Sequence, residues 1–163
     1  MALAAGGVSV GDRAPSFKIM TDDGEAVSSG TLKGAPYIVY FYPKDDTSGC
    51  TKEAIAFSDN LKKFEKAGVK VIGVSKDSVE SHAKFRKKHK LKLTLGSDPD
   101  IRMAQDWGVW GEKTLYGRKY MGMERATFLV NAKGVIEQAW RKVKVPGHVE
   151  AVLAAAKTLT DAP

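Results

Sequence analysis

The chain has 163 residues, of which 43% are hydrophobic and 28% are charged, as is usual for one globular domain with a substantial core. Its net charge of +7 calls for a test of nucleic-acid binding, while no apolar stretch is long enough to span a membrane. Residues 1–7 show neither a signal-peptide nor a transit-peptide pattern. We expect a single domain, residues 1–163, without membrane association.

The first half of the chain alternates strand and helix patterns. Two short apolar segments flank residues 22–24, Asp-Asp-Gly, and predict a hairpin. Residues 37–42 are apolar on both faces, as in a central strand, and residues 69–75 form a second such run. Between them lies a helical stripe that ends at Gly68. Its apolar positions are Ala54, Phe57, Leu61 and Phe64. This strand–helix–strand unit predicts parallel strands joined by a right-handed crossover.

The middle of the chain carries weaker signals. A helix is predicted over residues 79–89, a short strand over 92–96, and a short helix from Asp98 to Asp106. Residues 107–123 are rich in glycine and aromatic side chains, and we expect them to form a loop.

The last segments close the fold. Residues 126–130 and 135–140 flank Asn-Ala-Lys-Gly and predict a second hairpin. The final helix has an apolar stripe. The stripe consists of Val149, Val152, Leu153, Ala156 and Leu159. A parallel crossover combined with a closing hairpin, with helices available for both faces of a sheet, is compatible with a thioredoxin-like α/β fold.

Cys50 is the only cysteine, so no intrachain disulfide can form, and a reducing, cytoplasmic setting is expected. It follows the turn and helix-start residues 43–49, which places it in the first turn of a helix. Free N–H groups and the helix dipole favour an anion there, and a thiolate is the nucleophilic form of cysteine. The alternative is a buried, inert thiol. Polar neighbours and a position outside the apolar stripe favour the reactive interpretation.

A family resemblance extends this interpretation. Residues 41–53, FYPKDDTSGCTKE, resemble the active-site loop of peroxiredoxins, and most closely the bacterioferritin comigratory protein, or peroxiredoxin Q, type. The family pattern Pro-x-x-x-Thr/Ser-x-x-Cys is met by Pro43, Thr47 and Cys50. Two further segments of the chain also match the family, and the resemblance runs in order from Gly11 to Leu159. It implies a thioredoxin-like α/β fold, with a central mixed β-sheet and helices on both faces.

The resemblance also implies roles for individual residues. Cys50 would be the peroxidatic nucleophile, and the Thr47 hydroxyl would hydrogen-bond to the peroxide and the thiolate. Pro43 would shield the pocket, and Arg125 would bring a permanent positive charge to the sulfur. The ordinary alternatives are a helix N-cap for Thr47 and a surface ion pair with the adjacent Glu124 for Arg125.

A second, resolving cysteine is missing. Many relatives carry it where this chain has Ile55, and others carry it in the next helix, where this chain has Arg86. The resemblance therefore implies a one-cysteine peroxidase that reduces hydrogen peroxide and organic hydroperoxides, with thioredoxin, glutaredoxin or a small thiol as external reductant. A monomer is expected. The alternative from another class is a redox sensor or binding module that does not turn over.

Other candidate sites are weak. The basic run 84–92 is interpreted as a solvated helix face and its exit loop, because it lacks the interleaved aromatic residues that stack on bases. A basic nucleic-acid-binding protein is accordingly the third hypothesis, and no specific nucleic-acid partner is expected. His82 and His89 are interpreted as solvated side chains and His148 as structural, so no metal site is predicted. No phosphate-binding glycine loop is present, so no organic cofactor is implied.

Overall fold

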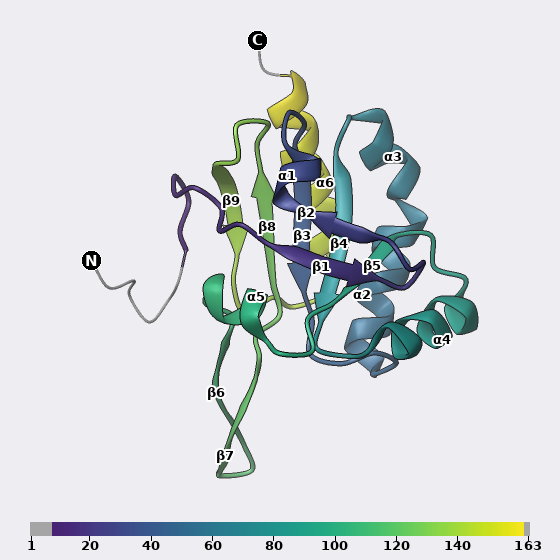
Figure 1. Cartoon of the computed structure of the whole chain (residues 1–163), viewed down its shortest axis with the longest axis vertical. Coiled ribbons are helices and arrows are strands. Elements are labelled where there is room, and N and C mark those ends of the chain that lie inside the picture. Colours follow the sequence, from purple (N-terminus) through teal and green to yellow (C-terminus); the bar gives the residue numbers. More distant parts are fainter. Residues whose placement is uncertain (1–7, 162–163) are drawn as a thin grey trace.

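The computed structural model describes residues 8–161, and its central feature is a seven-stranded β-sheet (Figure 1). The strands are β1 (Lys18–Thr21), β2 (Ala26–Ser28), β3 (Tyr37–Phe41), β4 (Lys70–Ser75), β5 (Thr94–Ser97), β8 (Ala126–Val130) and β9 (Ile136–Trp140). Their order in the sheet is β2-β1-β5-β4-β3-β8-β9. β3, β4 and β5 are parallel and the remaining pairs are antiparallel, so the sheet is mixed, as predicted. The predicted absence of a leader concerns residues 1–7, which lie outside the described part.

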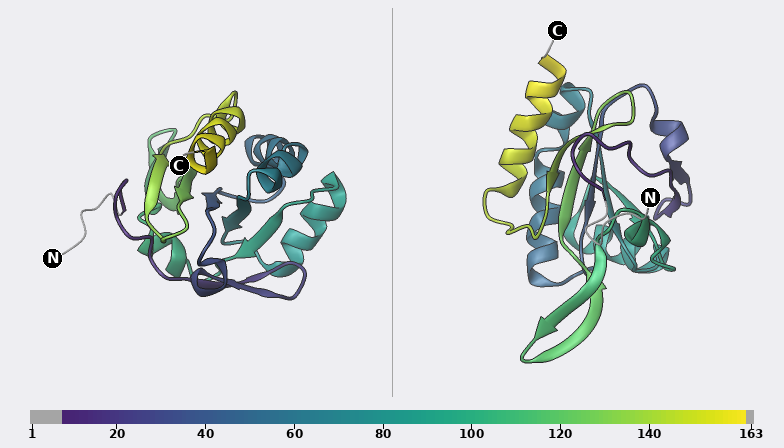
Figure 2. Two further views of the ribbon diagram at one scale, coloured as in Figure 1. Left: turned by 90° about the horizontal axis from the view of Figure 1, so that it is seen from above. Right: turned by 90° about the vertical axis from the view of Figure 1, so that its left-hand side faces the viewer.

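Helices cover both faces of this sheet. They are α1 (Ser29–Leu32), α2 (Ser48–Asp59), α3 (Leu61–Lys66), α4 (Val79–His89), α5 (Arg102–Asp106) and α6 (His148–Asp161). Apolar residues of α2, α3, α4 and α6 share one core, whereas α1 and α5 contribute to the core on the opposite face. Viewed from above, α2, α3 and α6 lie together on one side of the sheet (Figure 2). The prediction of helices on both faces is therefore confirmed.

Strand β3 shows how the sequence produces these two cores. All five of its residues are buried. Because successive side chains of a strand point to opposite faces, Ile38 and Tyr40 pack on the side of α2, while Val39 and Phe41 pack on the other side. A central strand covered on both faces has no polar alternation, and its end at Phe41 leads directly into the loop before Cys50.

The prediction of a loop over residues 107–123 is wrong. They contain a two-stranded hairpin, β6 (Trp110–Leu115) and β7 (Arg118–Met123), that forms a sheet of its own and extends away from the body of the molecule (Figure 1). Most of its side chains are exposed or half-buried, so no buried face imposes an apolar alternation on the sequence. Its turn residues, Tyr116 and Gly117, both have positive φ, as a two-residue hairpin turn requires. A tyrosine in the sequence gives no indication of such a turn.

Most of the remaining predicted elements lie close to their observed positions, but the short helix expected from Asp98 begins only at Arg102, and one helix is interrupted. The helix predicted to end at Gly68 is divided at Asn60 into α2 and α3. The Asn60 side-chain amide donates to the carbonyl oxygen of Ala56 at 2.8 Å, which terminates α2. Among the described residues, no helix combines the length and the apolar character needed to cross a bilayer.

Candidate active site

Cys50 lies in the first turn of α2, three residues after the N-cap residue Thr47. This position is the one predicted from the turn residues before it. The expectation that Cys50 lies outside the apolar stripe is wrong, because its side chain is only 1% exposed and belongs to the core on that face. Residues 50, 54 and 57 are spaced by four and three along the helix, so Cys50 shares the buried face with Ala54 and Phe57.

Arg125 reaches this buried sulfur from the segment between β7 and β8. Its Nη2 donates to the Cys50 Sγ at 3.3 Å, and its Nη1 donates to Glu53 Oε1 at 2.7 Å. The alternative ion pair with Glu124 is not formed, because Glu124 accepts from the Arg141 Nε at 2.8 Å. Burial by itself would lower the pKa of Arg125, but the charges of Glu53 and Cys50 outweigh it and raise that pKa above its ordinary value. The guanidinium therefore stays charged beside the sulfur.

The approach of Arg125 depends on Gly49. A Cβ atom added to Gly49 would lie 3.2 Å from Arg125 Nη2, closer than most carbon contacts allow. The guanidinium thus lies directly against the bare first turn of α2. A side chain at this position would require the guanidinium to shift by a few tenths of an ångström.

Glu53 completes the polar cluster around the cation. The sequence assigns it no role. Its side chain is 0% exposed, one turn after Cys50 on the same helix. Burial raises the pKa of Glu53 to about 7, although the adjacent Arg125 charge works in the opposite direction. The second oxygen, Oε2, has no hydrogen-bond partner among the described residues. The available sequence signal was the spacing of three residues from Cys50, which places both side chains on one helix face.

His148, at the start of α6, borders the same cluster. Its Nε2 lies 4.0 Å from Glu53 Oε2 and 2.7 Å from the Thr127 hydroxyl. Burial, assisted by the positive charge of Arg125, lowers the pKa of His148 to about 4. His148 is therefore a buried, neutral group near neutral pH.

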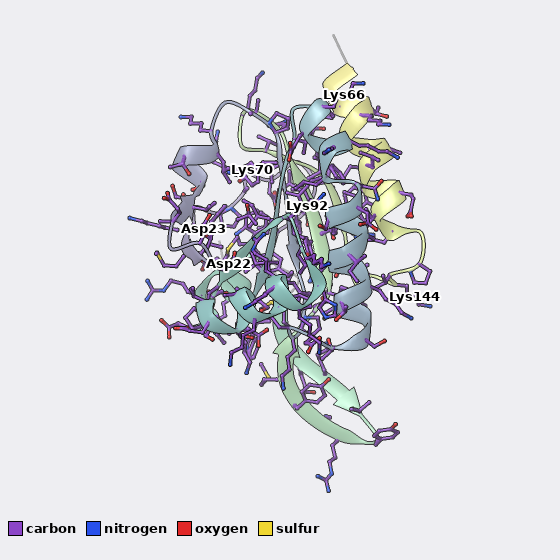
Figure 3. All side chains as sticks on the ribbon, turned by 90° about the vertical axis from the view of Figure 1, so that its right-hand side faces the viewer. Asp22, Asp23, Lys66, Lys70, Lys92 and Lys144 are labelled. Carbon is purple, nitrogen blue, oxygen red and sulfur yellow. The ribbon has the colours of Figure 1, made fainter. Side chains whose placement is uncertain are left out.

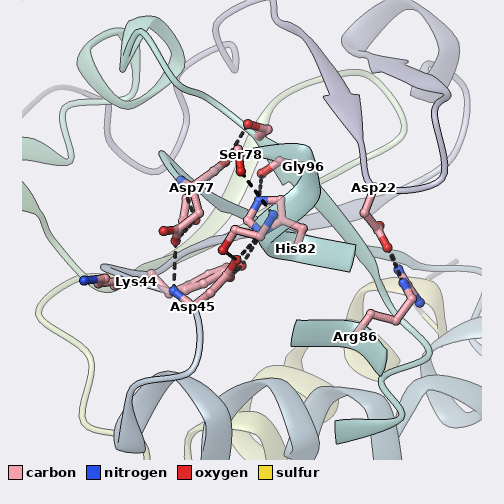
Figure 4. Close-up of polar contacts among 12 residues, drawn as sticks. Asp22, Lys44, Asp45, Asp77, Ser78, His82, Arg86 and Gly96 are labelled. Carbon is pink, nitrogen blue, oxygen red and sulfur yellow. Dashed lines mark hydrogen bonds and ion pairs between the residues drawn. The ribbon is translucent and has the colours of Figure 1, made fainter. Parts of the chain in front are cut away.

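The loop between β3 and α2 is anchored to α4 by a buried ion pair (Figure 4). Asp45 Oδ2 lies 2.7 Å from His82 Nδ1, and His82 Nε2 lies 2.9 Å from the carbonyl oxygen of Gly96. His82 thus bridges the Asp45 carboxylate and the backbone of Gly96. Burial raises the pKa of Asp45, but hydrogen bonds from His82 and Tyr42 prevail and hold it below its ordinary value. The interpretation of His82 as solvated is therefore wrong.

The next loop residue is also held by α4. Asp46 accepts from Lys88 Nζ at 2.6 Å and lies 2.9 Å from His89 Nε2. Asp46 adopts a positive φ of 60°, which the turn into α2 imposes. Two adjacent aspartates of the active-site loop thus contact two histidines seven residues apart on one helix.

Thr47 and Pro43 lie in the same loop. Thr47 occupies the N-cap position, but its side chain does not cap the helix and donates instead to the carbonyl oxygen of Lys44 at 2.8 Å. Its side chain is exposed, and Pro43, directly after Tyr42, is half-buried. Their expected contacts with peroxide remain predictions.

The two positions where relatives carry a resolving cysteine have structural roles here. Ile55 packs against the core on the side of α2. The guanidinium of Arg86 donates to both carboxylate oxygens of Asp22 and, at 2.8 Å, to the carbonyl oxygen of Leu91 (Figure 4). Arg86 therefore ties the end of α4 to the turn between β1 and β2. Within residues 8–161, no group of three or more side chains is arranged to bind a metal ion.

Comparison with known proteins agrees with this geometry. The AhpC/TSA family model matches residues 10–139. A putative Bcp peroxiredoxin of Coxiella burnetii is 51% identical over 90% of this chain and 97% of its own. Bcp of Bacillus subtilis is 41% identical over 94% and 98%. The solved structure of Xanthomonas campestris peroxiredoxin Q has a TM-score of 0.85 at 43% identity, covering 89% of this chain and 92% of that one.

Fold and site together define a thiol-dependent peroxidase with a thioredoxin-like fold, which confirms the fold predicted from the resemblance. The chain belongs to the AhpC/TSA family and, within it, to the Bcp or peroxiredoxin Q type. Its single cysteine fits a one-cysteine mechanism that uses an external thiol.

Proposed function

We propose that Cys50 is the peroxidatic cysteine and that Arg125 stabilises its thiolate. The thiolate attacks one oxygen of the peroxide, an S–O bond forms as the O–O bond breaks, and the departing oxygen takes a proton to leave as water or an alcohol. The peroxide is reduced by two electrons and Cys50 becomes a sulfenic acid. The observation that carries this proposal is the contact of 3.3 Å between Arg125 Nη2 and Cys50 Sγ at the first turn of α2.

The neighbouring loop residues support the oxidative step. Arg125 stabilises the charge that shifts from sulfur to the leaving oxygen, because its donors are fixed in place by Glu53. Thr47 is exposed at the start of α2, where rotation of its hydroxyl away from Lys44 offers a donor to peroxide. Pro43 limits the access of water to the sulfur from the side of the loop.

The reductive step needs a thiol from outside the chain. Its thiolate attacks the sulfenic sulfur, water departs, and a second thiol then releases Cys50 and forms the disulfide of the reductant. Thioredoxin, glutaredoxin or a small thiol could fill this role. Because Cys50 is 1% exposed, the first turn of α2 must open before any of them reaches the sulfur.

The broader proposal concerns substrates and setting. A structure of the Xanthomonas campestris relative addresses its alkyl peroxide reduction activity, which supports organic hydroperoxides as substrates here alongside hydrogen peroxide. We further propose that residues 1–163 form one domain and act as a monomer in the cytoplasm without a specific nucleic-acid partner. The single free cysteine supports a reducing compartment.

Peroxide consumption in excess dithiothreitol tests the function. The wild type should turn over continuously, and Cys50→Ser should not. Consumption of one equivalent followed by a stall would support the redox sensor, and turnover by Cys50→Ser would overturn the proposal. The rate of Cys50 oxidation should also be orders of magnitude higher in the native than in the urea-unfolded protein.

A further inference from the structure

The hairpin β6–β7 exposes apolar side chains to an unusual degree. Of the six large apolar residues that are exposed in the described part, four lie on it. They are Leu115 (55%), Tyr116 (96%), Tyr120 (45%) and Met121 (55%). An isolated pair of strands is at best marginally stable in water, so its apolar surface is not explained by folding. Exposed apolar clusters of this kind mark interaction sites.

The register of the hairpin separates two different faces. Residues paired across the strands share a face, so Leu115 with Arg118, Lys113 with Tyr120, and Gly111 with Gly122 lie on one side. We call these six residues the glycine face. The opposite face carries Met121 and the acidic residue Glu112, which lies 3.7 Å from Lys119. The glycine face thus combines apolar and cationic side chains without a carboxylate.

Gly122 shapes this face, whereas the space above Gly111 is open. A Cβ atom on Gly122 would lie 2.9 Å from the Lys113 Cδ and 3.2 Å from the Tyr120 Cε2. Both side chains therefore lie flat across the bare strand, and the Lys113 Nζ donates to the carbonyl oxygen of Met123 at 2.9 Å. The tyrosine ring and the lysine stem form a preset surface near the base of the hairpin.

The hairpin lies at the same end of the molecule as Cys50. β7 ends at Met123, and Arg125, which contacts the Cys50 sulfur, follows two residues later. Figures 1 and 3 show the hairpin extending beyond this end, with its side chains standing free of the body. Six residues of strand span roughly 20 Å, which is about the reach needed to contact a small protein domain positioned over the sulfur.

A hollow at the base of the hairpin continues the surface toward the body. It is lined by residues of β6 and by Glu124, Arg141 and Lys142. Glu124 is already neutralised by Arg141. The lining holds three cations, Lys113, Arg141 and Lys142, and two carboxylates, Glu112 and Glu124, so the hollow adds a small excess of positive charge.

We propose that the glycine face of the β6–β7 hairpin docks an acidic, thioredoxin-type protein that reduces oxidised Cys50. This inference rests on the proposed function, because a peroxidase with a single cysteine depends on an external thiol to reduce its sulfenic acid. Tyr120 and Leu115 supply the apolar contact, and Arg118 meets carboxylates on the partner. A second copy of this chain is disfavoured as the occupant, because its charge of +7 and its equally cationic glycine face would repel the first.

The test uses the full-length protein with two alternative reductants, an acidic thioredoxin and dithiothreitol. Arg118→Glu and the double variant Leu115→Ser/Tyr120→Ser should each raise the KM for thioredoxin about tenfold, as expected for centrally placed interface residues. Turnover with dithiothreitol should stay unchanged, which shows that fold and chemistry are intact. Lys119→Glu is the matched control, because Lys119 is adjacent in sequence and lies on the opposite face.

Three outcomes would overturn the docking proposal. The first is an unchanged KM for thioredoxin in both variants, or an equal rise in Arg118→Glu and Lys119→Glu. The second is a wild type that turns over with dithiothreitol but not with thioredoxin. The third is a wild-type dimer in sedimentation that Arg118→Glu dissociates, which would make a second copy the occupant. Failure of the wild type with dithiothreitol would instead contradict the proposed function.

Discussion

One guanidinium, that of Arg125, bridges two buried acids on successive turns of α2: its Nη2 contacts Cys50 Sγ at 3.3 Å and its Nη1 contacts Glu53 Oε1 at 2.7 Å. The two acids share a single cation in a site with little access to water. Glu53 holds Arg125 in position, but its negative charge also competes with a Cys50 thiolate for the positive charge of Arg125. We therefore expect the reactivity of Cys50 to depend on the cation and on the protonation of Glu53.

Removal of the cation should slow the oxidation of Cys50. Arg125→Gln keeps a hydrogen-bond donor of smaller reach and removes the charge, so we expect the second-order rate with hydrogen peroxide to fall by roughly 10²–10³-fold. Stopped-flow measurement of thiol loss checks this. Arg102→Gln, an exposed arginine at the start of α5, is the control and should leave the rate unchanged. A wild-type rate in Arg125→Gln would contradict the assigned role.

The substitution Gly49→Ala should lower the rate of Cys50 oxidation without lowering the stability of the fold. Gly49→Ala replaces a poor helix former in the first turn of α2, which favours the fold by up to about 1 kcal/mol. The new Cβ would lie 3.2 Å from Arg125 Nη2, however, and should push the guanidinium away from Cys50. We expect slower oxidation with equal or higher thermal stability. Gly24→Ala, a turn glycine with open space around it, should lower stability through its positive φ and leave oxidation unaffected.

The buried acid and the buried histidine should impose opposite pH dependences on stability. Folding raises the pKa of Glu53 from 4.5 to about 7, so its contribution is complete below about pH 4.5 and is lost as the pH rises through 7. Folding lowers the pKa of His148 from 6.5 to about 4, so its contribution is complete above pH 6.5 and is lost as the pH falls through 4. Between pH 4.5 and 6.5 the two effects oppose each other.

In Glu53→Gln, the contribution of His148 should therefore dominate the pH dependence of stability. Between pH 4 and 8, the free energy of unfolding of the variant should rise by about 3 kcal/mol relative to that of the wild type. Urea unfolding at several pH values measures this difference. Glu65→Gln, an exposed acid on α3, should follow the wild-type curve. If the Glu53→Gln curve also runs parallel to the wild type, Glu53 does not retain its proton on folding.

Substitutions of the two histidines of α4, His82 and His89, should differ sharply in their effect on stability. His82→Leu leaves Asp45 buried without its ionic partner, and we expect a loss of about 3–5 kcal/mol in stability. Faster amide exchange in residues 44–47 should accompany it, because Asp45 anchors that loop. His89→Gln removes only an exposed contact to Asp46 and should be close to neutral. Equal effects of the two substitutions would show that the buried pair is not the anchor.

The sequence alone was sufficient for several features that are encoded locally. The run 37–42 and the turn residues after it placed Cys50 at the start of a helix, since strand periodicity and helix-start preferences act over a few neighbouring residues. The absence of a second cysteine fixed the need for an external thiol. The resemblance added Arg125, Thr47 and Pro43, and the geometry brings Arg125 to the sulfur.

Only the tertiary structure decided what lies around that sulfur. Arg125 is 75 residues from Cys50 in the chain, and its choice of Glu53 over the adjacent Glu124 depends on where β8 and α2 meet. The burial of His82 likewise depends on the loop that packs over α4. The hairpin β6–β7 escaped prediction because neither face is buried, so no alternation marks it. Local periodicity records which side of an element is buried, and it does not record which distant group lies against that side.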